Sequence, residues 1–406
     1  MTERLERRLG TGDAVVIGLG SMIGAGVFAA FAPAARAAGA GLLIGLAIAA
    51  VVAYCNATSS ARLAARYPSS GGTYVYGRER LGDFWGYLAG WGFVVGKTAS
   101  CAAMALTVAA YTAPGLGRAG QSAIAAAAVL TLTALNYFGV QRSALATRVI
   151  VAVSLLVLAG AVVAIGVAGD PSASRLSPFP GSGVLGILQA AGLLFFAFAG
   201  YARIATLGEE VRDPEHAIPR AIPIALGITL VVYAAVAIAL LLQLGPTALG
   251  AAADPVAQAV PSGLSPVVRA GAALAALGSL LALVLGVSRT AFAMARDGHL
   301  PRTLAAVHPR HGVPHHAEIA VGVVVALLVA FTDLRGAIGF SSFAVLTYYA
   351  IANASAWTLR AGRAIPAVGL AGCVVLAFTL PLSSVVSGCA MLAVGALAWV
   401  VRTRAR

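Results

Sequence analysis

The chain has 406 residues, of which 60% are hydrophobic and only 10% are charged, and its mean hydropathy is +0.91. Soluble domains carry about 25% charged residues, so this composition excludes them and indicates an integral membrane protein. The net charge of +13 does not indicate nucleic-acid binding, because the basic residues stand singly between apolar runs rather than in a stripe. At about 20 apolar residues per membrane helix, the length predicts an all-α protein with about twelve transmembrane helices.

A glycine-rich stretch, Gly18 to Phe28, interrupts the first apolar segment, which covers about residues 14–35. Glycine in a helix interior costs about 1 kcal/mol relative to alanine, which favours a break in the helix here. Unwound backbone at membrane depth is tolerated only where it is buried in protein or lines a cavity. The freed backbone groups are therefore candidate ligand groups.

The two sides of this break have opposite chemistry. N–H groups at the start of the second half-helix, near Gly26, suit an anion such as a carboxylate. The carbonyls of Met22 and Ile23 suit an ammonium group or a small cation. Gly20 and Gly24 also match a GxxxG helix-packing face, and this motif alone does not distinguish packing from a break.

Eleven further apolar spans follow, separated by polar connections such as residues 69–80, 170–183 and 245–265. The sixth span contains a second glycine interruption, from Phe195 to Tyr201. Two interrupted spans five apart indicate inverted repeats of five helices, with a site where the breaks meet. The eleven spans are expected near residues 41–60, 84–110, 122–137, 146–167, 184–207, 221–242, 267–291, 319–331, 337–357, 366–380 and 384–401.

The distribution of arginines predicts the orientation. One side of the spans collects most of them, and the other collects Arg118, Arg175, Arg269 and Arg335. By the positive-inside rule, we expect a multi-pass protein of the cytoplasmic membrane with both termini cytoplasmic. An even number of spans, such as twelve, fits this orientation.

Four motifs occur in order along the chain: Gly20–Phe28, Tyr67–Tyr76, Glu209–Pro219 and Met294–Pro301. Together they resemble the signatures of the amino acid-polyamine-organocation (APC) superfamily. The resemblance implies a LeuT-type fold in a single transporter domain over residues 1–406. The first inverted repeat would cover 12–168, the second 184–357, and 364–402 would hold two additional helices. It also implies secondary transport of an amino acid or related amine by alternating access.

The resemblance assigns the substrate site to the backbone of the two breaks. The substrate carboxylate would bind N–H groups in the first break, and the substrate amine would bind carbonyls of both. The residues involved are Met22, Ile23, Gly24, Ala25 and Gly26 in the first break, and Phe198, Ala199, Gly200 and Tyr201 in the second.

Two positions bear on ion coupling. Some similar family members carry a lysine in the fifth span in place of a sodium ion, but this chain has Ser154 there, which puts a coupling role for that position in doubt. Lys97, the only lysine, lies in the third span. Because burying a charge in a membrane costs roughly 3 kcal/mol or more, Lys97 is a candidate proton-coupling group or fixed cation. The alternative is a structural tether to helix-end carbonyls.

Other charged residues are expected near the cytoplasmic ends of the spans. Arg203 would either pair with Glu209 or Glu210 to lock a gate or attract a second substrate carboxylate, and the gate is favoured. Asp13 is expected to pair with a cytoplasmic arginine. All six histidines fall on the predicted cytoplasmic side, so we expect no proton relay of histidines in the membrane. The segment from His308 to His316 contains two prolines that break helical spacing, which favours a solvated loop over a metal site.

The span interiors contain no clear Asp or Glu, which favours a neutral amino acid as substrate over a cationic one. The aromatic residues of the second break either shape an apolar pocket or serve as ordinary packing. We therefore expect a proton-coupled permease that uses Lys97, with no cofactor and no metal. The alternatives are an exchanger or uniporter, a sodium symporter using Ser279 or Ser288, and a non-transporting sensor. The sequence contains no nucleophile–base pair of the kind that would indicate an enzyme, and the four cysteines lack the spacing of metal ligands.

Overall fold

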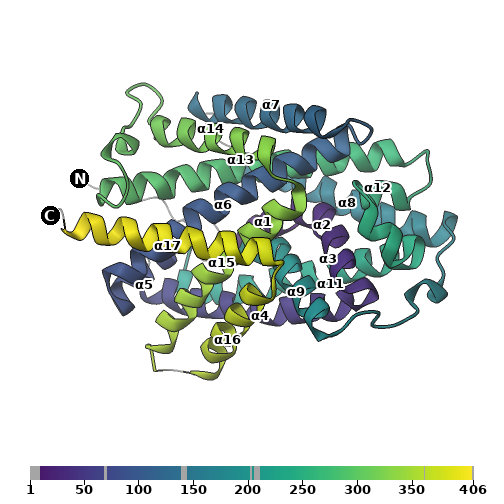
Figure 1. Cartoon of the computed structure of the whole chain (residues 1–406), viewed down its shortest axis with the longest axis horizontal. Helices are drawn as coiled ribbons and strands as arrows, with labels where there is room; N and C mark the ends of the chain where they lie inside the picture. The colour runs from purple at the N-terminus through teal and green to yellow at the C-terminus, as the bar shows by residue number, and fades with distance from the viewer. Residues whose placement is uncertain are drawn as a thin grey trace.

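The structure is a computed structural model that describes residues 10–67, 71–138, 144–201, 204, 211–360 and 362–404. All regular elements of these residues are helices (Figure 1). In chain order they are α1 Thr11–Met22, α2 Ala25–Ala29, α3 Phe31–Ala38, η1 Gly39–Gly41, α4 Leu42–Arg66, α5 Thr73–Leu81, α6 Asp83–Thr112, α7 Arg118–Tyr137, α8 Ala144–Ala168, η2 Ala173–Leu176, α9 Val184–Phe198, η3 Ala199–Tyr201, α11 Pro214–Ala251, α12 Pro255–Ala259, α13 Ser265–Arg296, η4 Arg302–Ala305, α14 His315–Phe331, α15 Leu334–Trp357, α16 Ala364–Thr379 and α17 Leu382–Arg404.

Within the described ranges, ten helical segments are long and apolar enough to cross a membrane, and α14 and α16 are shorter apolar helices. All of them lie where apolar spans were predicted, so the prediction of an all-helical, multi-pass membrane protein is confirmed. The helices run mostly along the longest axis of the molecule (Figure 1). This arrangement leaves little of the described chain outside the bundle.

Two connections expected to be loops contain helices. Residues 73–81 form α5, whose Tyr74 and Tyr76 are buried against α6 and α15. Three consecutive charged residues in this segment favoured a polar loop, although the other face of the helix is packed. The loop expected at 245–265 holds the end of α11, which is kinked at Gly245 (φ 74°), and then α12.

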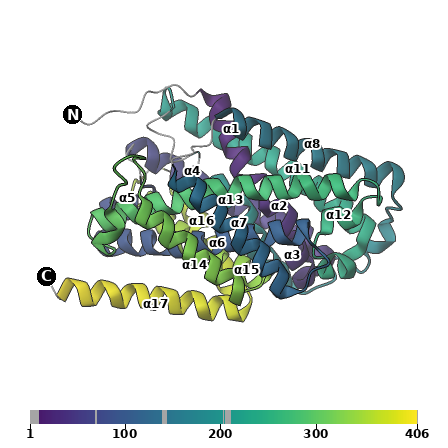
Figure 2. The same ribbon diagram turned by 90° about the horizontal axis from the view of Figure 1, so that it is seen from above.

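Helix α6 is the central element of the bundle. It packs against α5, α7, α13 and α15, and most of its length is buried. Helices α1, α8 and α11 pack together at one edge, whereas α17 lies at the opposite edge and is largely exposed (Figure 2). At the edge formed by α1, the expected pairing of Asp13 is confirmed, because its carboxylate accepts a hydrogen bond from the Arg148 guanidinium of α8.

A buried polar cluster joins α4, α15 and α16. The Ser59 hydroxyl donates to Asn353 Oδ1 at 2.7 Å, and Asn353 Nδ2 donates to Asn56 Oδ1 at 2.7 Å and to the Tyr349 carbonyl at 2.9 Å. Cys373 of α16 lies beside the same amides, with its Sγ 3.3 Å from Asn56 Oδ1. These hydrogen bonds join α4 to α15, while Asn56 Nδ2 has no partner among the described residues.

Candidate functional site

The first helix breaks where its glycines predicted a break. Helix α1 ends at Met22, and α2 begins at Ala25. The two residues between them are not helical: Ile23 has φ −83° and ψ 66°, and Gly24 has φ −128° and ψ −137°. Among the described residues, no side chain caps the start of α2. All residues of this break are buried, so its free N–H groups point into protein rather than lipid.

The second break lies against the first. Helix α9 passes into the 3₁₀ turn η3 at Ala199. A Cβ added to Gly200 would press on the Ser21 carbonyl and would lie 2.8 Å from Met22 N, and a Cβ added to Gly26 would lie 2.7 Å from Ala197 Cα. The two breaks therefore meet backbone to backbone, which only glycine permits at these positions.

Tyr233 of α11, which the sequence did not single out, spans the two breaks. Its hydroxyl lies 2.6 Å from the Met22 carbonyl oxygen and 3.0 Å from the Ala197 carbonyl oxygen. One turn earlier, the Thr229 hydroxyl faces Met22 Sδ at 3.8 Å. Two hydroxyl residues four apart in an apolar span are the signal that sequence reasoning could have used, because both point from one helix face.

Replacing Tyr233 with phenylalanine is expected to lower the free energy of unfolding by about 1–3 kcal/mol, because buried carbonyls lose their hydrogen-bond donor. Thermal unfolding of the purified protein measures this change. Tyr54→Phe is the matched control, since Tyr54 is 46% exposed on α4. Equal shifts for the two variants would show that the bridge contributes nothing.

Ser279 of α13 faces the first break. Its hydroxyl is buried, has no hydrogen-bond partner in the described part of the chain, and is the atom that a Cβ on Gly24 would meet first. Ser288, the other hydroxyl considered for a cation site, donates to the Leu285 carbonyl of its own helix at 3.0 Å. Of the two, only Ser279 has its hydroxyl free and placed at the break.

Lys97 lies at the second break. It projects from α6, is 8% exposed, and its Nζ lies 3.5 Å from the Ala199 carbonyl oxygen, the one acceptor within its reach among the residues described. This contact is at the outer limit of a hydrogen bond. The structure thus places a buried lysine beside η3, a position compatible with both the tether and the coupling role.

Of the remaining candidates for coupling and gating, the structure describes only Ser154. Ser154 of α8 is buried, and its hydroxyl donates to the Ile150 carbonyl at 2.7 Å, so it is satisfied within its own helix. Arg203, Glu209 and Glu210 lie outside the residues that the structure describes.

The aromatic residues of the second break pack against neighbouring helices. The ring of Phe198 lies 5.0 Å from that of Tyr233, and the ring of Phe195 lies 5.9 Å from that of Tyr349. Tyr201 stacks at 5.1 Å on Tyr349, and neither hydroxyl makes a hydrogen bond of acceptable geometry within the described chain. Phe195 and Phe198 therefore serve as packing, while the two tyrosines also carry spare polar atoms.

One buried acid was not expected. Helix α14 begins at His315, four residues before the predicted span, and so includes Glu318, which is fully buried. Both of its carboxylate oxygens lack a partner among the described residues. Because α14 packs mainly against α6, α7 and α13, Glu318 lies away from the contact between the breaks.

Known proteins resemble the chain across both breaks. A family model described as amino acid permease matches residues 13–366. An uncharacterized transporter of Mycobacterium tuberculosis is 68% identical, over 98% of this chain and 92% of the relative. A branched-chain amino acid permease of Bacillus subtilis is 28% identical, over 88% of this chain and 81% of the relative. The vacuolar cationic amino acid transporter 4 of Arabidopsis thaliana is 31% identical, over 82% of this chain and 59% of the relative.

Proposed function

The chain belongs to the amino acid permease family, and from this premise we propose that it is a secondary active transporter of a neutral amino acid that works by alternating access. The observation that carries the proposal is the backbone contact between the two helix breaks. Glycines that let unwound segments touch in mid-membrane are costly unless the freed backbone groups bind something. A LeuT-type arrangement of twelve helices, with repeats at 12–168 and 184–357, accounts for two breaks five spans apart.

The substrate carboxylate is assigned to the N–H groups of Ala25 and Gly26, with Gly24 beside them. These groups begin α2, which has no side-chain cap among the described residues, and Ala30 joins α2 to α3 with helical torsion angles (φ −81°, ψ −22°). The unpartnered hydroxyl of Ser279 faces the same point and is a further donor for the carboxylate. A helix start with free N–H groups is a general anion site.

The substrate amine is assigned to Ile23 and to the η3 carbonyls rather than to Met22. The Met22 carbonyl already accepts from Gly24 N at 2.9 Å and lies 2.6 Å from the Tyr233 hydroxyl, so both of its lone pairs are used. The hydrogen bonds of Met22 then hold in place the backbone that carries the Ile23 carbonyl. This refines the site implied by the family resemblance.

A neutral side chain is favoured because Lys97 supplies a positive charge at η3. A cationic side chain entering the same region would be repelled in a medium of low dielectric constant. The named relatives include both a branched-chain amino acid permease and a cationic amino acid transporter, and the positive charge at η3 favours a neutral substrate for this chain.

Lys97 is also the proposed coupling group. It is buried, it touches the second break, and movement of η3 would change the one acceptor that it has among the described residues. A proton taken up or released there would accompany the conformational cycle. Sodium coupling through the first break is the second candidate. It is supported by the Ser279 hydroxyl, which faces Gly24 and has no partner among the described residues. The excess of arginines on one side of the predicted spans supports a cytoplasmic location for both termini.

Specificity is tested by counterflow in proteoliposomes. Vesicles loaded with unlabelled leucine should take up external labelled leucine, and excess isoleucine or valine should inhibit this uptake by about tenfold, whereas arginine and lysine should leave it nearly unchanged. Empty vesicles are the control. Stronger inhibition by arginine than by isoleucine would overturn the neutral substrate while leaving transport itself intact.

A further inference from the structure

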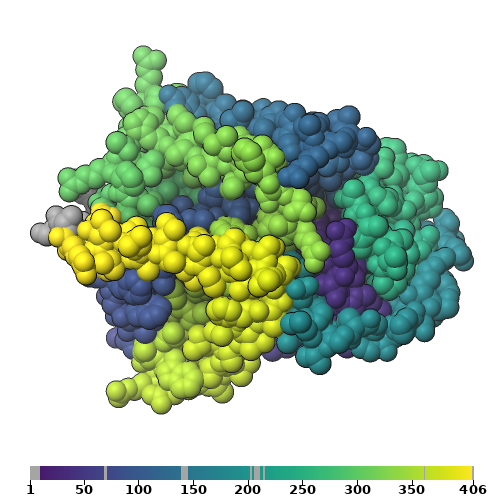
Figure 3. Space-filling model, in the orientation of Figure 1, coloured from purple at the N-terminus to yellow at the C-terminus, as the bar shows by residue number. Residues whose placement is uncertain are grey.

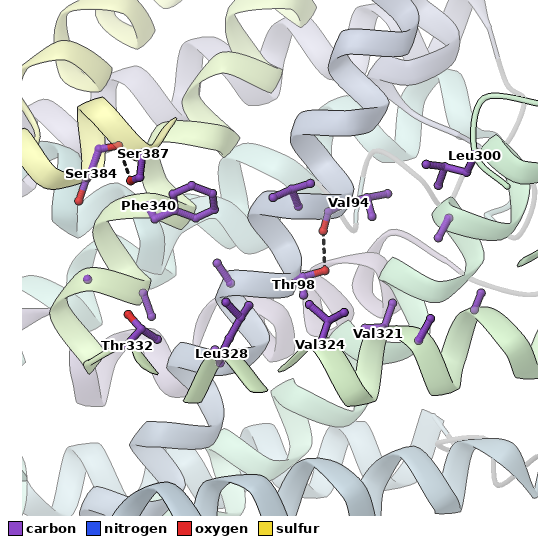
Figure 4. Close-up of a pocket in the computed structure, with 18 of the residues that line it drawn as sticks. Val94, Thr98, Leu300, Val321, Val324, Leu328, Thr332, Phe340, Ser384 and Ser387 are labelled. Carbon is purple, nitrogen blue, oxygen red and sulfur yellow. Dashed lines mark hydrogen bonds between the residues drawn. The ribbon is translucent and has the colours of Figure 1, made fainter. Parts of the chain in front are cut away.

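A groove of about 640 Å³ lies on the outer surface of the bundle, away from the helix breaks. It runs between α14 and α17, with α6 and α15 beneath it, and Figure 3 shows it as the hollow beside the yellow C-terminal helix. Most of its lining is apolar. The residues labelled in Figure 4 include Val94 and Thr98 of α6, Val324 and Leu328 of α14, Phe340 of α15 and Ser387 of α17.

Two of the hydroxyl residues in this groove, Thr98 and Ser387, hydrogen-bond to carbonyls of their own helices. Figure 4 shows Thr98 Oγ1 donating to the Val94 carbonyl, at 2.7 Å, and Ser387 Oγ facing the Ser384 carbonyl oxygen, at 3.2 Å. Ser387 Oγ also lies 2.7 Å from the Ser383 carbonyl oxygen. Their protons are therefore not offered to a ligand. The interior of the groove suits an apolar occupant rather than an amino acid or a sugar.

The groove opens to the surface that faces lipid. Val323 and Leu327, on the same helix as the lining residues, are 46% and 57% exposed. Along α14 the lining runs from Ala317 to Leu328, a rise of about 17 Å at 1.5 Å per residue. This is slightly more than half of the hydrocarbon core of about 30 Å, so its length matches the depth of one leaflet.

One end of the groove is basic. Leu300 and Leu304 line it there and flank the exposed Arg302 of η4. Arg402, in the last turn of α17, lies close to His299, since its charge adds to the effect of burial in lowering the pKa of that histidine. The Trp399 and Tyr87 rings, 5.1 Å apart, lie beside His299, as aromatic residues do at a membrane interface.

We propose that this groove binds an anionic phospholipid, with an acyl chain between α14 and α17 and the headgroup phosphate on Arg302 and Arg402. Lipid tails are as apolar as leucine, so an apolar groove alone does not select one lipid from the bilayer. Selection must come from the headgroup, and the two arginines at the mouth supply a positive charge for it. The bound chain would pack on α6, whose Lys97 lies at the second break.

Native mass spectrometry of the delipidated full chain tests the proposal without any transport assay. Equal amounts of dioleoyl phosphatidylglycerol or dioleoyl phosphatidylcholine are added, and the bound fraction is measured. Wild type should retain the anionic lipid about tenfold better. The double variant Arg302→Gln with Arg402→Gln should lose that preference, whereas Arg118→Gln, an exposed arginine expected at the other end of the bundle, should keep it.

A matched pair of variants tests the groove itself. Val324 lines it and Val323 does not, although both are 46% exposed. Val324→Trp should reduce the bound fraction of the anionic lipid about tenfold, and Val323→Trp should leave it unchanged. Equal binding of the anionic lipid by the two variants would overturn the proposal, as would equal retention of the two lipids by wild type. A protein dimer lost only in Val324→Trp would also overturn it, because a second copy of the chain would then be the occupant.

Discussion

Gly200→Ala is expected to lower transport at least about tenfold while the protein still inserts and purifies. The added methyl group would press on the backbone of Ser21 and Met22, which cannot move aside as a side chain can. Overpacking of this kind costs about 1–3 kcal/mol or more, and each 1.36 kcal/mol corresponds to a factor of ten. We therefore expect counterflow to fall by at least about tenfold, measured in proteoliposomes at equal protein content.

The control for this variant is Gly227→Ala. Gly227 lies on α11, and a Cβ there would meet no atom within 4 Å. The same substitution should leave transport unchanged at that position. Wild-type activity in Gly200→Ala would mean that the two breaks do not touch in the working protein.

Lys97→Ala is expected to abolish accumulation driven by a proton gradient while leaving exchange intact. Exchange requires the substrate site to alternate, whereas accumulation also requires a group that gains and loses a proton. Lys97 is the buried basic group at the second break, 3.5 Å from the Ala199 carbonyl oxygen. The measurement is uptake of labelled leucine into proteoliposomes with and without an inward proton gradient.

Lys97→Arg separates the two ways in which this residue could act. Arginine keeps the charge but does not release its proton in proteins. Loss of accumulation in Lys97→Arg would assign a proton-transfer role, and retained accumulation would assign a fixed charge. If Lys97→Ala accumulates leucine as wild type does, the residue is a structural tether only.

The breaks and the span positions could be predicted because each leaves a local signal. Glycines that are costly in a helix mark the first break, and apolar runs of sufficient length mark the spans. The pairing of Asp13 could also be predicted from local sequence, because an acidic residue at a helix end that is rich in arginines lies near a basic partner. None of these inferences needs to know which helices are neighbours.

What could not be predicted depends on contacts between distant segments. Tyr233 and Thr229 mark a polar face of α11 in the sequence, but the contact of that face with both breaks depends on how α11 packs. Asn353 and Asn56 are nearly 300 positions apart, yet they share a hydrogen bond. Helix α5 was not predicted because its charged residues favoured a loop, although one face of the helix is packed. Burial of Glu318 was not predicted because the start of α14 has a sequence typical of a loop.

The measurement that tests the central claim most directly is the time course of labelled leucine in proteoliposomes that contain the wild-type chain. A transporter should deliver label to the vesicle interior, where it is released when the membrane is permeabilised, and uptake should saturate with concentration. The account predicts this result, with greater accumulation when the outside is acidic. Label that binds with saturation but stays on the protein, with none inside the vesicles, would contradict it and identify a sensor.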